Sequence, residues 1–344
     1  MDFKYNFSIV ICCFNSESRI SKTLKHIANQ KTIDFITWEV IVINNNSTDR
    51  TTEIARRIWF ETKSTIEFKV VDEKNPGLSF ARQKGTLMSE GEYILFCDDD
   101  NWLDSNYIQK AYEILQIDSK IGMLGGIGTE FIEGETPEWF EKNKKTYAVG
   151  PQSETEGDIT FSKAYVYGAG VIIKKELLIV LNEIGFKHVL TDRIGKKMVS
   201  GGDNELGYAI ALLNFKIYYS TSLKFQHFIP DNRLKLNYLK RIRIGQTYTF
   251  TAVKTYQNYI FKNDTVYKPL SFKNDVLINM KKIIVLNINY IRGKVTNFDY
   301  YLKQPKFLSN IVYFLLHNKQ DYNTYVKVQN NIKLILNHNK ISKL

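Results

Sequence analysis

Short apolar runs alternate with segments of helical periodicity over the first hundred residues of the chain. The first run, Phe7 to Phe14, is nearly continuous in apolar residues and is followed by polar residues that suit a helix start. Beyond it, apolar residues recur at helical spacing at Ile20, Leu24 and Ile27. The pattern predicts strands at 7–14, 38–43, 66–71 and 93–97, and helices at 20–27, 54–60 and 78–88.

Continuous apolar strands separated by helices predict an α/β fold with a mostly parallel, Rossmann-like sheet covered by helices on both faces. Ligands of such sheets bind beyond the carboxyl ends of the strands, so the turns after Phe14, Ile43 and Cys97 should converge on one crevice. Further along, we expect a strand at 165–173, helices at 174–182 and 203–213, and strands within 216–228; beyond Asn237 the pattern is mainly helical.

Charge divides the chain into two parts. The net charge is +11 over 344 residues, but residues 231–344 carry 20 Lys or Arg against 5 Asp, a net +15. Three interpretations stay open for this basic region: solvated helical faces, an anionic membrane surface, or nucleic acid. No recognised nucleic-acid motif accompanies the charge, so no nucleic-acid partner is expected.

Composition adds two expectations about location. Three cysteines, two of them adjacent, give no disulfide framework or metal knuckle, which favours a reducing compartment. The first residues lack the ordered features of a signal peptide, and the longest apolar runs fall short of the ~18 residues that cross a bilayer. We therefore expect a cytoplasmic protein, either soluble or peripheral on the inner face of the cell membrane.

The densest chemical signal is the triplet Asp98, Asp99 and Asp100, directly after a predicted buried strand. Adjacent carboxylates repel one another unless a cation or solvent neutralises them. If strand geometry persists, Asp98 and Asp100 point the same way, which suits Mg²⁺ or Mn²⁺ bound with substrate phosphates. The alternative is an exposed acidic turn without a ligand.

Four segments in order resemble the family 2 glycosyltransferases with the GT-A fold. They are residues 10–15 (VICCFN), 39–49 (EVIVINNNSTD), 75–82 (NPGLSFAR) and 98–100 (DDD). The resemblance extends to about Arg233. It implies a GT-A nucleotide-sugar transferase domain at 1–233, followed by a basic, mostly helical region at 234–344. It also implies transfer of a sugar from a nucleotide diphosphate donor, with inversion, and a divalent metal at the aspartates.

The resemblance assigns the donor side of the site. It implies that Phe14 packs on the base, with Cys12 near the ribose, although both also suit a core. Asn44 stands where the family usually has an aspartate that reads the base, and an amide can still pair with a pyrimidine edge. Arg82 matches a basic position near the donor phosphates. Asp98 and Asp99 are further nucleotide candidates, and Asp98 and Asp100 are the metal candidates.

A second motif, residues 200–207 (SGGDNELG), resembles the family's Gly-Glu-Asp motif with glycine in its middle position. Asp203 then matches the catalytic base that takes the acceptor's proton. Asp203 as a plain helix cap is the alternative. Glu205 is a rival base and also a candidate contact to the acceptor sugar. Gly168 lies in a segment that resembles a substrate loop, where a small residue lets the backbone approach a sugar.

The remaining candidates rest on context. His227 falls where related enzymes complete the metal site or contact the diphosphate, although a lone histidine is often structural. Trp102 and Trp139 are candidate platforms for an acceptor sugar, with core packing as the alternative.

The sequence thus predicts an inverting, metal-dependent hexosyltransferase that uses Mn²⁺ or Mg²⁺ and a UDP-linked donor. Its expected acceptor is a glycan or lipid-linked saccharide in surface polysaccharide synthesis, with the C-terminal region on an anionic membrane. Two alternatives remain: a nucleotide- or sugar-binding protein of the same fold without catalysis, and a sugar nucleotidyltransferase. A Rossmann dehydrogenase is disfavoured, because no Gly-x-Gly-x-x-Gly follows the first strand.

Overall fold

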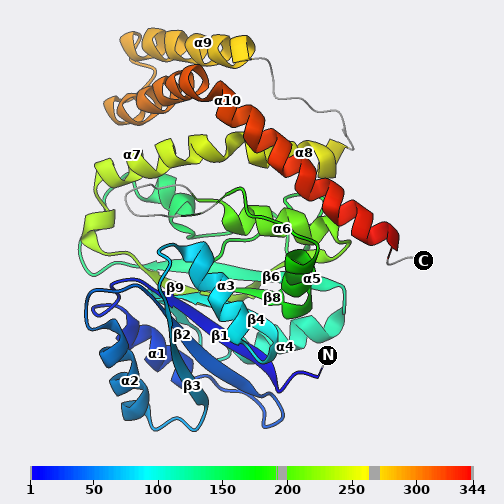
Figure 1. The fold of residues 1–344 in the computed structure, drawn as a ribbon. Helices are drawn as coiled ribbons and strands as arrows, with labels where there is room; N and C mark the ends of the chain where they lie inside the picture. Colours follow the sequence, from blue (N-terminus) through cyan, green and yellow to red (C-terminus); the bar gives the residue numbers. More distant parts are fainter. Residues whose placement is uncertain (1, 191, 193–199, 263–271, 342–344) are drawn as a thin grey trace.

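The structure is a computed structural model that describes residues 2–190, 192, 200–262 and 272–341. Within these residues, a nine-stranded sheet forms the middle of the molecule, helices pack on both of its faces, and a C-terminal group of helices lies to one side (Figure 1). The predicted α/β, GT-A-like fold with a mainly helical C-terminal part is therefore confirmed.

Four parallel strands from the first hundred residues make one half of the sheet, in the order β3–β2–β1–β4. They are β1 (Tyr5–Cys13), β2 (Trp38–Asn45), β3 (Glu67–Glu73) and β4 (Gly91–Asp98). In this register, Cys12 lies between Ile43 and Asp98, so polar residues of three segments meet at the carboxyl edge. All four strands were predicted from the apolar runs.

The other half of the sheet is mixed and continues the order with β8–β6–β9–β5, while β7 pairs with β9. Its strands are β5 (Asn101–Leu103), β6 (Ile121–Phe131), β7 (Gly157–Asp158), β8 (Val171–Lys174) and β9 (Lys216–Phe228). The strand β8 is antiparallel to both of its neighbours, whereas β6 and β9 are parallel.

The strand predicted at 165–173 is wrong in its first half. The structure has a loop there, and β8 begins only at Val171. The reason is that the backbone N–H groups of Tyr167 and Gly168 donate to the side chains of Gln152 and Asp203 instead of to a strand. Gly170 then takes φ +68, in the left-handed region, just before β8 begins.

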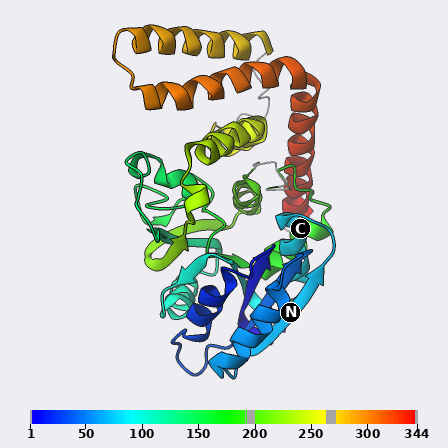
Figure 2. The same cartoon turned by 90° about the vertical axis from the view of Figure 1, so that its left-hand side faces the viewer.

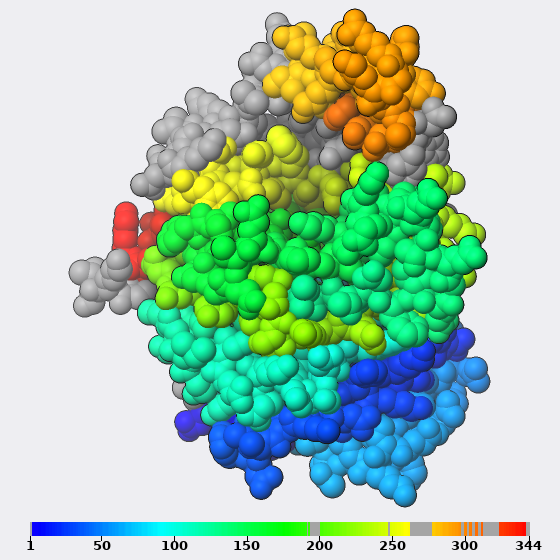
Figure 3. Space-filling model, turned by 180° about the vertical axis from the view of Figure 1, so that it is seen from behind, coloured from blue at the N-terminus to red at the C-terminus, as the bar shows by residue number. Residues whose placement is uncertain are grey.

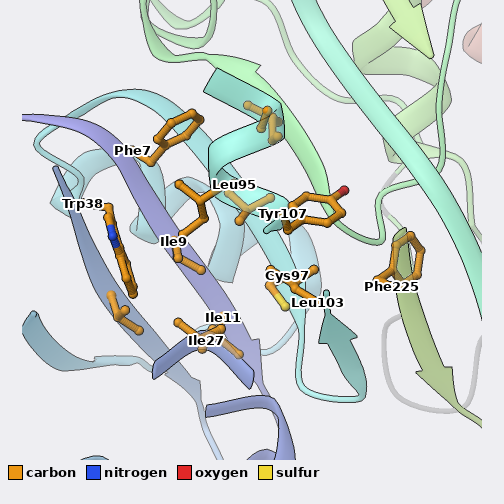
Figure 4. Packing of buried hydrophobic residues seen from close by; sticks show 14 of the residues in the cluster. Phe7, Ile9, Ile11, Ile27, Trp38, Leu95, Cys97, Leu103, Tyr107 and Phe225 are labelled. Atoms are coloured by element: carbon orange, nitrogen blue, oxygen red, sulfur yellow. The ribbon is translucent and has the colours of Figure 1, made fainter. Parts of the chain in front are cut away.

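Side-chain alternation along the strands directs apolar residues to two separate cores. Ile9 and Ile11 of β1 pack with Leu95 and with helices α1, α2 and α4, and Figure 4 shows part of this cluster around Tyr107. Val10 faces the opposite side, toward α3, α5 and α6. These helices span Ile20–Ala28 (α1), Thr51–Thr62 (α2), Leu78–Met88 (α3), Tyr107–Ile117 (α4), Lys175–Glu183 (α5) and Gly202–Leu212 (α6).

The C-terminal helices continue the second core rather than standing apart from it. Tyr256 of α8 stacks on Tyr208 of α6 with ring centroids 5.4 Å apart, and Val328 and Ile332 of α10 join the same cluster. The helices are α7 (Leu236–Gly245), α8 (Phe250–Lys262), α9 (Phe272–Ile291) and α10 (Asn297–Ile341), and the 3₁₀ turns are η1 (Glu141–Tyr147), η2 (Asp231–Arg233) and η3 (Gln246–Thr249). The boundary at residue 234 stays a prediction.

Figure 2 shows α9 and the first half of α10 as an outlying pair, while the second half of α10 runs back toward the sheet. Among the described helices, none combines the length and the apolar character that crossing a bilayer requires.

Candidate functional site

A pocket of about 640 Å³ opens at the carboxyl ends of β1 and β4, between the sheet and the helices α6 to α8. Its size is typical of small-molecule sites. It brings together predicted residues from six separate segments of the chain. Those that line it are Cys12, Arg82, Asp98, Asp99, Asp100, Gly168, Asp203 and His227. Phe14, Asn44, Trp102 and Glu205 do not belong to its lining.

Asp98 is the acid of the triplet that lacks a direct partner. It is the last residue of β4, and no described residue donates a hydrogen bond or forms an ion pair to its carboxylate. Burial and the negative charge of Asp100 raise the pKa of Asp98 to about 6, against the opposing effect of the Arg82 guanidinium. This side chain is therefore a half-buried acid whose carboxylate is open to a ligand from the pocket.

Asp99 points in another direction, toward helix α1. Arg19 donates to its Oδ2 at 2.7 Å, and the Ser16 hydroxyl donates to the same oxygen. Thr23 donates to the Asp99 backbone carbonyl at 2.8 Å. Burial and the charge of Asp100 raise the pKa of Asp99, while Arg19 and Ser16 oppose the shift. Its carboxylate thus ties the triplet to α1.

Asp100 faces the strand β9 and the segment that follows it. Arg233 donates to its Oδ2 at 2.8 Å, and Asn101 donates to its Oδ1 at 3.2 Å. Burial alone would raise the pKa of Asp100, but His227, Arg233 and Arg19 together hold it well below its usual value. Asp100 is therefore the member of the triplet that loses its proton most readily.

His227, near the end of β9, is oriented by a backbone contact. Its Nδ1 lies 2.7 Å from the carbonyl oxygen of Tyr147, and because a carbonyl only accepts, Nδ1 carries the proton. Nε2 then faces Asp100 Oδ1 at 3.6 Å. A histidine that donates one ring N–H to a carbonyl and leaves the other nitrogen free has the arrangement of a metal ligand.

These residues fit a divalent cation on the chemistry of their donor atoms. Two carboxylates and an imidazole nitrogen converge on one pocket, and one carboxylate, that of Asp98, is desolvated without a contacting cation among the described side chains. Hard oxygen ligands suit Mg²⁺ and Mn²⁺. A carboxylate cluster of different character, Glu39, Glu67 and Glu90, lies at the opposite edge of the sheet.

That second cluster is an ion-pair network. Lys69 lies 3.1 Å from Glu39 and 2.9 Å from Glu67, so a lysine ammonium already occupies the place where a cation would sit. Glu39 also accepts from the Ser8 hydroxyl at 2.7 Å. We therefore assign no metal to this cluster.

Arg82 lies in the wall of the pocket, where it faces several acids. Its Nη1 is 3.6 Å from Asp192, and Asp98 and Asp203 also contribute to the field that raises its pKa against the effect of burial. A Cβ atom added at Gly168 would lie 2.5 Å from Arg82 Nη2. A side chain at position 168 would therefore displace the guanidinium from this place.

Asp203 sits in the first turn of α6, and two backbone groups hold its carboxylate. Gly168 N–H donates to Oδ2 at 2.8 Å, and Asn204 N–H donates to Oδ1 at 3.0 Å. Burial and the nearby charge of Asp192 raise the pKa of Asp203, while Arg82 and the two N–H donors limit the rise. The group is thus a fixed carboxylate with increased basicity, which suits a general base.

Asp192 was missed in the sequence. Its Oδ1 accepts from the N–H groups of Gly201 at 3.1 Å and Gly202 at 2.8 Å, so it caps α6 from outside the helix. A Cβ at Gly202 would lie 2.4 Å from the Asp192 carboxylate, which explains the glycine there. No local pattern marked Asp192, because its partners follow nine or more residues later.

Glu205 is enclosed by protein. Its Oε2 accepts from the N–H groups of Val189 at 2.8 Å and Leu190 at 2.9 Å, and Oε1 accepts from the Tyr256 hydroxyl at 3.1 Å. The side chain is fully buried. These contacts describe a residue that joins α6 to a loop and to α8.

The donor-side candidates lie around the rim of the pocket or beyond it. Phe14 is 56% exposed, just after β1. Asn44 donates to Asp72 at 2.8 Å and accepts from the Ser47 N–H at 3.3 Å, which engages both ends of its amide. Burial raises the pKa of the Cys12 thiol to about 12, so this residue is a neutral wall of the pocket.

The aromatic candidates lie in packed surroundings. Trp102 is buried, with its ring 5.7 Å from that of Phe228 and 5.8 Å from the His26 ring, both stacked. Trp139 packs against Phe140 in a small cluster with the start of α7.

The C-terminal region supplies a wall of the pocket that the sequence did not indicate. Tyr238 and Ile242 of α7, and Phe250 and Val253 of α8, line it. The basic charge of residues 231–344 and their mainly helical pattern carry no information about which cavity these helices face. Arg233, which binds Asp100, was likewise not assigned.

Comparisons with known proteins identify the family of this chain. The family model for Glycosyl transferase family 2 matches residues 8–181. A cholesterol galactosyltransferase of Borreliella burgdorferi is 33% identical over 116 residues, which cover 34% of this chain and 31% of that protein. A poly(ribitol-phosphate) beta-glucosyltransferase of Bacillus spizizenii is 31% identical over 156 residues, 42% of this chain and 24% of the relative. The match thus spans a third or less of the length of these relatives.

Two solved structures share the fold. S. aureus TarS 1–349 in complex with UDP-GlcNAc aligns with a TM-score of 0.54 at 17% identity, covering 98% of this chain and 92% of that one. Mannosyltransferase PcManGT from Pyrobaculum calidifontis, in complex with GDP-Man and Mn²⁺, aligns with a TM-score of 0.53 at 16% identity, covering 100% and 92%. Because the family model covers half of the chain and the GT-A-like fold agrees with it, this chain belongs to glycosyl transferase family 2.

Proposed function

We propose that this chain is an inverting, metal-dependent hexosyltransferase that uses a UDP-linked sugar as its donor. The observation that carries the proposal is the placement of Asp203 in one pocket with Asp98, Asp100 and His227. Asp203 is a fixed carboxylate with a raised pKa, and the other three offer ligand atoms for a cation. One pocket thus provides a base for the acceptor and a cation site for the leaving group.

For the donor, we propose that Asp98, Asp100 and His227 Nε2 hold Mn²⁺ or Mg²⁺. When bound, the ion neutralises charge on the diphosphate. Arg82 adds a fixed positive charge on the same side of the pocket. Phe14 packs on the base, Cys12 lies near the ribose, Asn44 reads the base edge, and Asp99 steadies the triplet through Arg19.

For the chemistry, Asp203 takes the proton of the acceptor hydroxyl as that oxygen forms its bond to the anomeric carbon. The bond from this carbon to the diphosphate oxygen breaks, and the nucleoside diphosphate leaves with the electron pair. Attack from the face opposite the leaving group inverts the anomeric configuration. The N–H groups of Gly168 and Asn204 keep the Asp203 oxygens in place throughout.

For the acceptor, we propose a glycan or lipid-linked saccharide in surface polysaccharide synthesis. The name of the Bacillus spizizenii relative, a poly(ribitol-phosphate) beta-glucosyltransferase, supports an acceptor of this general kind. Of the proposed acceptor contacts, Gly168 is supported by its position in the pocket lining, to which Trp102 and Glu205 do not belong. Action at the cytoplasmic face of the membrane, with the basic C-terminal region against anionic lipid, stays a prediction.

The test is a donor screen that follows release of free nucleoside diphosphate, with Mn²⁺ and with a chelator. We expect release from a UDP-sugar with Mn²⁺, and its loss with the chelator or in Asp100→Asn. Asp118→Asn is the matched control, because Asp118 is a partly exposed aspartate paired with Lys216 at 2.8 Å and lies outside the pocket lining. Full turnover in Asp100→Asn contradicts the metal site, and tight nucleotide binding without release indicates a binding protein.

A further inference from the structure

Helix α9 carries an exposed apolar stripe. Five residues form this stripe, and each follows the previous one by three or four positions. At that spacing, all five side chains lie on one side of the helix. They are Leu277, Met280, Ile284, Ile288 and Ile291. Their exposed fractions range from 42% at Ile288 to 83% at Ile291. Ile278 and Val285, also exposed, lie beside this stripe.

The opposite side of α9 is packed against α10. Leu286 is buried there, and the Tyr290 ring stacks on that of Tyr300 with centroids 4.2 Å apart. The Tyr300 hydroxyl donates to Asn287 at 2.7 Å. The helix is thus apolar on two sides, and one of these sides is already packed against α10. A second apolar side exposed to water marks an interaction surface.

The position of α9 favours a large, flat partner. Figures 1 and 2 show α9 as the outermost helix, at the end of the molecule farthest from α2. In the space-filling view of Figure 3, the same end projects beyond the rest of the chain. A planar surface can therefore approach α9 without meeting the sheet or its helices.

The charge around the stripe is entirely basic. Residues 277–294 include four Lys or Arg and no Asp or Glu. By helical spacing, Lys281 of α9 and Arg292, which directly follows the last residue of α9, lie between the stripe and the row formed by Ile278 and Val285. An apolar side bordered by cations is typical of a helix that lies in the interface of an anionic bilayer. A second copy of the chain docked by the same face would bring like charges together.

We propose that the α9 stripe is the surface by which this chain docks on an anionic lipid bilayer. The inference rests on the membrane association included in the proposed function, and it names the helix, the side chains and the orientation. The apolar residues enter the boundary between headgroups and acyl chains, while Lys281, Lys282, Arg292 and Lys294 meet the lipid phosphates. The pocket, between α7 and the sheet, stays on the water side.

The test measures co-sedimentation of the full chain with vesicles of phosphatidylcholine alone or with 30% phosphatidylglycerol, on the order of the anionic content of natural membranes. We expect binding to the anionic vesicles only, weakening as salt rises. Ile284→Ser combined with Ile288→Ser should reduce partitioning at least about tenfold, because apolar burial is removed. Lys281→Gln combined with Arg292→Gln should reduce it severalfold without changing the apolar stripe.

Phe60→Ser is the matched control, since Phe60 is an apolar side chain 85% exposed on α2, at the far end of the molecule. Nucleoside diphosphate release from a soluble donor, measured without vesicles, should be unchanged in all three variants, which separates docking from the proposed function. Equal vesicle partitioning of the wild type and both α9 variants would overturn the inference. A dimer in solution that dissociates in the Ile284 and Ile288 variant would also overturn it, by assigning the stripe to a second copy.

Discussion

The backbone N–H of Gly168 donates to Asp203 Oδ2 at 2.8 Å, across a separation of 35 residues in the chain. This bond, together with that from the Asn204 N–H, fixes the direction of the Asp203 carboxylate in the pocket. Position 168 also sets the space available to Arg82. A single glycine therefore aligns the proposed base and leaves room for the guanidinium that we propose faces the donor.

Replacement of Asp203 by asparagine should abolish most of the turnover. The amide keeps the size of the side chain but cannot take a proton, and a positioned general base contributes about 10²- to 10⁴-fold to a rate. We expect kcat to fall within that range, with nucleotide affinity changed little. Steady-state kinetics and calorimetric titration with UDP measure the two quantities.

Glu205→Gln provides the comparison for the rival base. Glu205 is buried and accepts from Val189, Leu190 and Tyr256, so its loss of charge should weaken those contacts by roughly 1–2 kcal/mol of unfolding free energy. Its kcat should remain within about threefold of the wild-type value, far from the range expected for a lost base. The assignment is wrong if Glu205→Gln loses turnover while Asp203→Asn retains it.

Gly168→Ala should weaken donor binding. The added methyl would lie 2.5 Å from Arg82 Nη2, so the guanidinium has to move, and overpacking of this kind typically has an effect of about 1–3 kcal/mol. We expect the KM for the donor to rise by roughly tenfold, which corresponds to about 1.4 kcal/mol.

Gly134→Ala is the control for this change. A Cβ there would approach nothing closer than an Asp231 oxygen at 3.4 Å, an ordinary contact. Its KM should match that of the wild type. An unchanged KM in Gly168→Ala as well would remove Arg82 from the donor site.

Phe14→Ala tests the proposed stacking on the base. Phe14 is 56% exposed, so its removal should leave no cavity in the core. Aromatic stacking contributes about 0.5–1.5 kcal/mol beyond area burial, so the Kd for UDP should rise by about 2- to 12-fold. Phe60→Ala, on the exposed side of α2, should leave the Kd unchanged; equal effects of the two variants would indicate that Phe14 is only a surface residue.

Lys163 should make stability rise with pH in a defined window. Its Nζ donates to the Gln152 carbonyl at 2.7 Å and lies 4.4 Å and 4.6 Å from the ring centroids of Tyr165 and Tyr167. Burial lowers the pKa of Lys163 to about 8 from 10.5, against the opposing charge of Asp203. Between about pH 8 and 10.5 the unfolded chain therefore holds a proton that the folded chain has released.

The sign follows from this difference in bound protons. Below pH 8 the folded protein bears the full penalty of a buried ammonium, and the penalty fades as pH rises toward 10.5. Urea unfolding at pH 7, 8, 9 and 10 gives the unfolding free energies of the wild type and of Lys163→Met. Subtracting one from the other removes the contributions of the other titrating groups, because both proteins share them. Above pH 8 the unfolding free energy of the wild type should increase relative to that of the variant. If this difference in unfolding free energy stays constant or decreases with pH, the lowered pKa of Lys163 is contradicted.

Local sequence was sufficient for the parallel half of the sheet. Apolar runs of strand length, each followed by polar turn residues, predicted β1 to β4 and the crevice at their carboxyl ends. The strand β6 left no comparable signal, because it contains Gly125, Gly126 and Gly128, which contribute no side-chain pattern. Added Cβ atoms at Gly125 and Gly126 would collide with Val166 and Leu223, so close packing required those glycines.

For the site, the acidic triplet after a strand nominated Asp100, and the resemblance to the family 2 glycosyltransferases nominated Asp203 and His227; their roles remain predictions. Sequence patterns did not identify Arg233 or Asp192. The contacts of these two side chains are with residues far away in the chain, which only folding brings close. Arg233 reaches Asp100 across 133 residues.

The sequence by itself determined the strand and helix order of the first hundred residues and the presence of three acids at the end of β4, because both follow from side chains that are neighbours in the chain. Only the tertiary structure decided the surroundings of each acid. Arg19, at the start of α1, binds Asp99, and Arg233 and His227 lie against Asp100. Asp98 has no cationic side chain in contact with it among the described residues. The physical reason is that hydrogen bonding and desolvation depend on atoms from distant segments, and adjacent residues of the same type receive different surroundings when the chain folds.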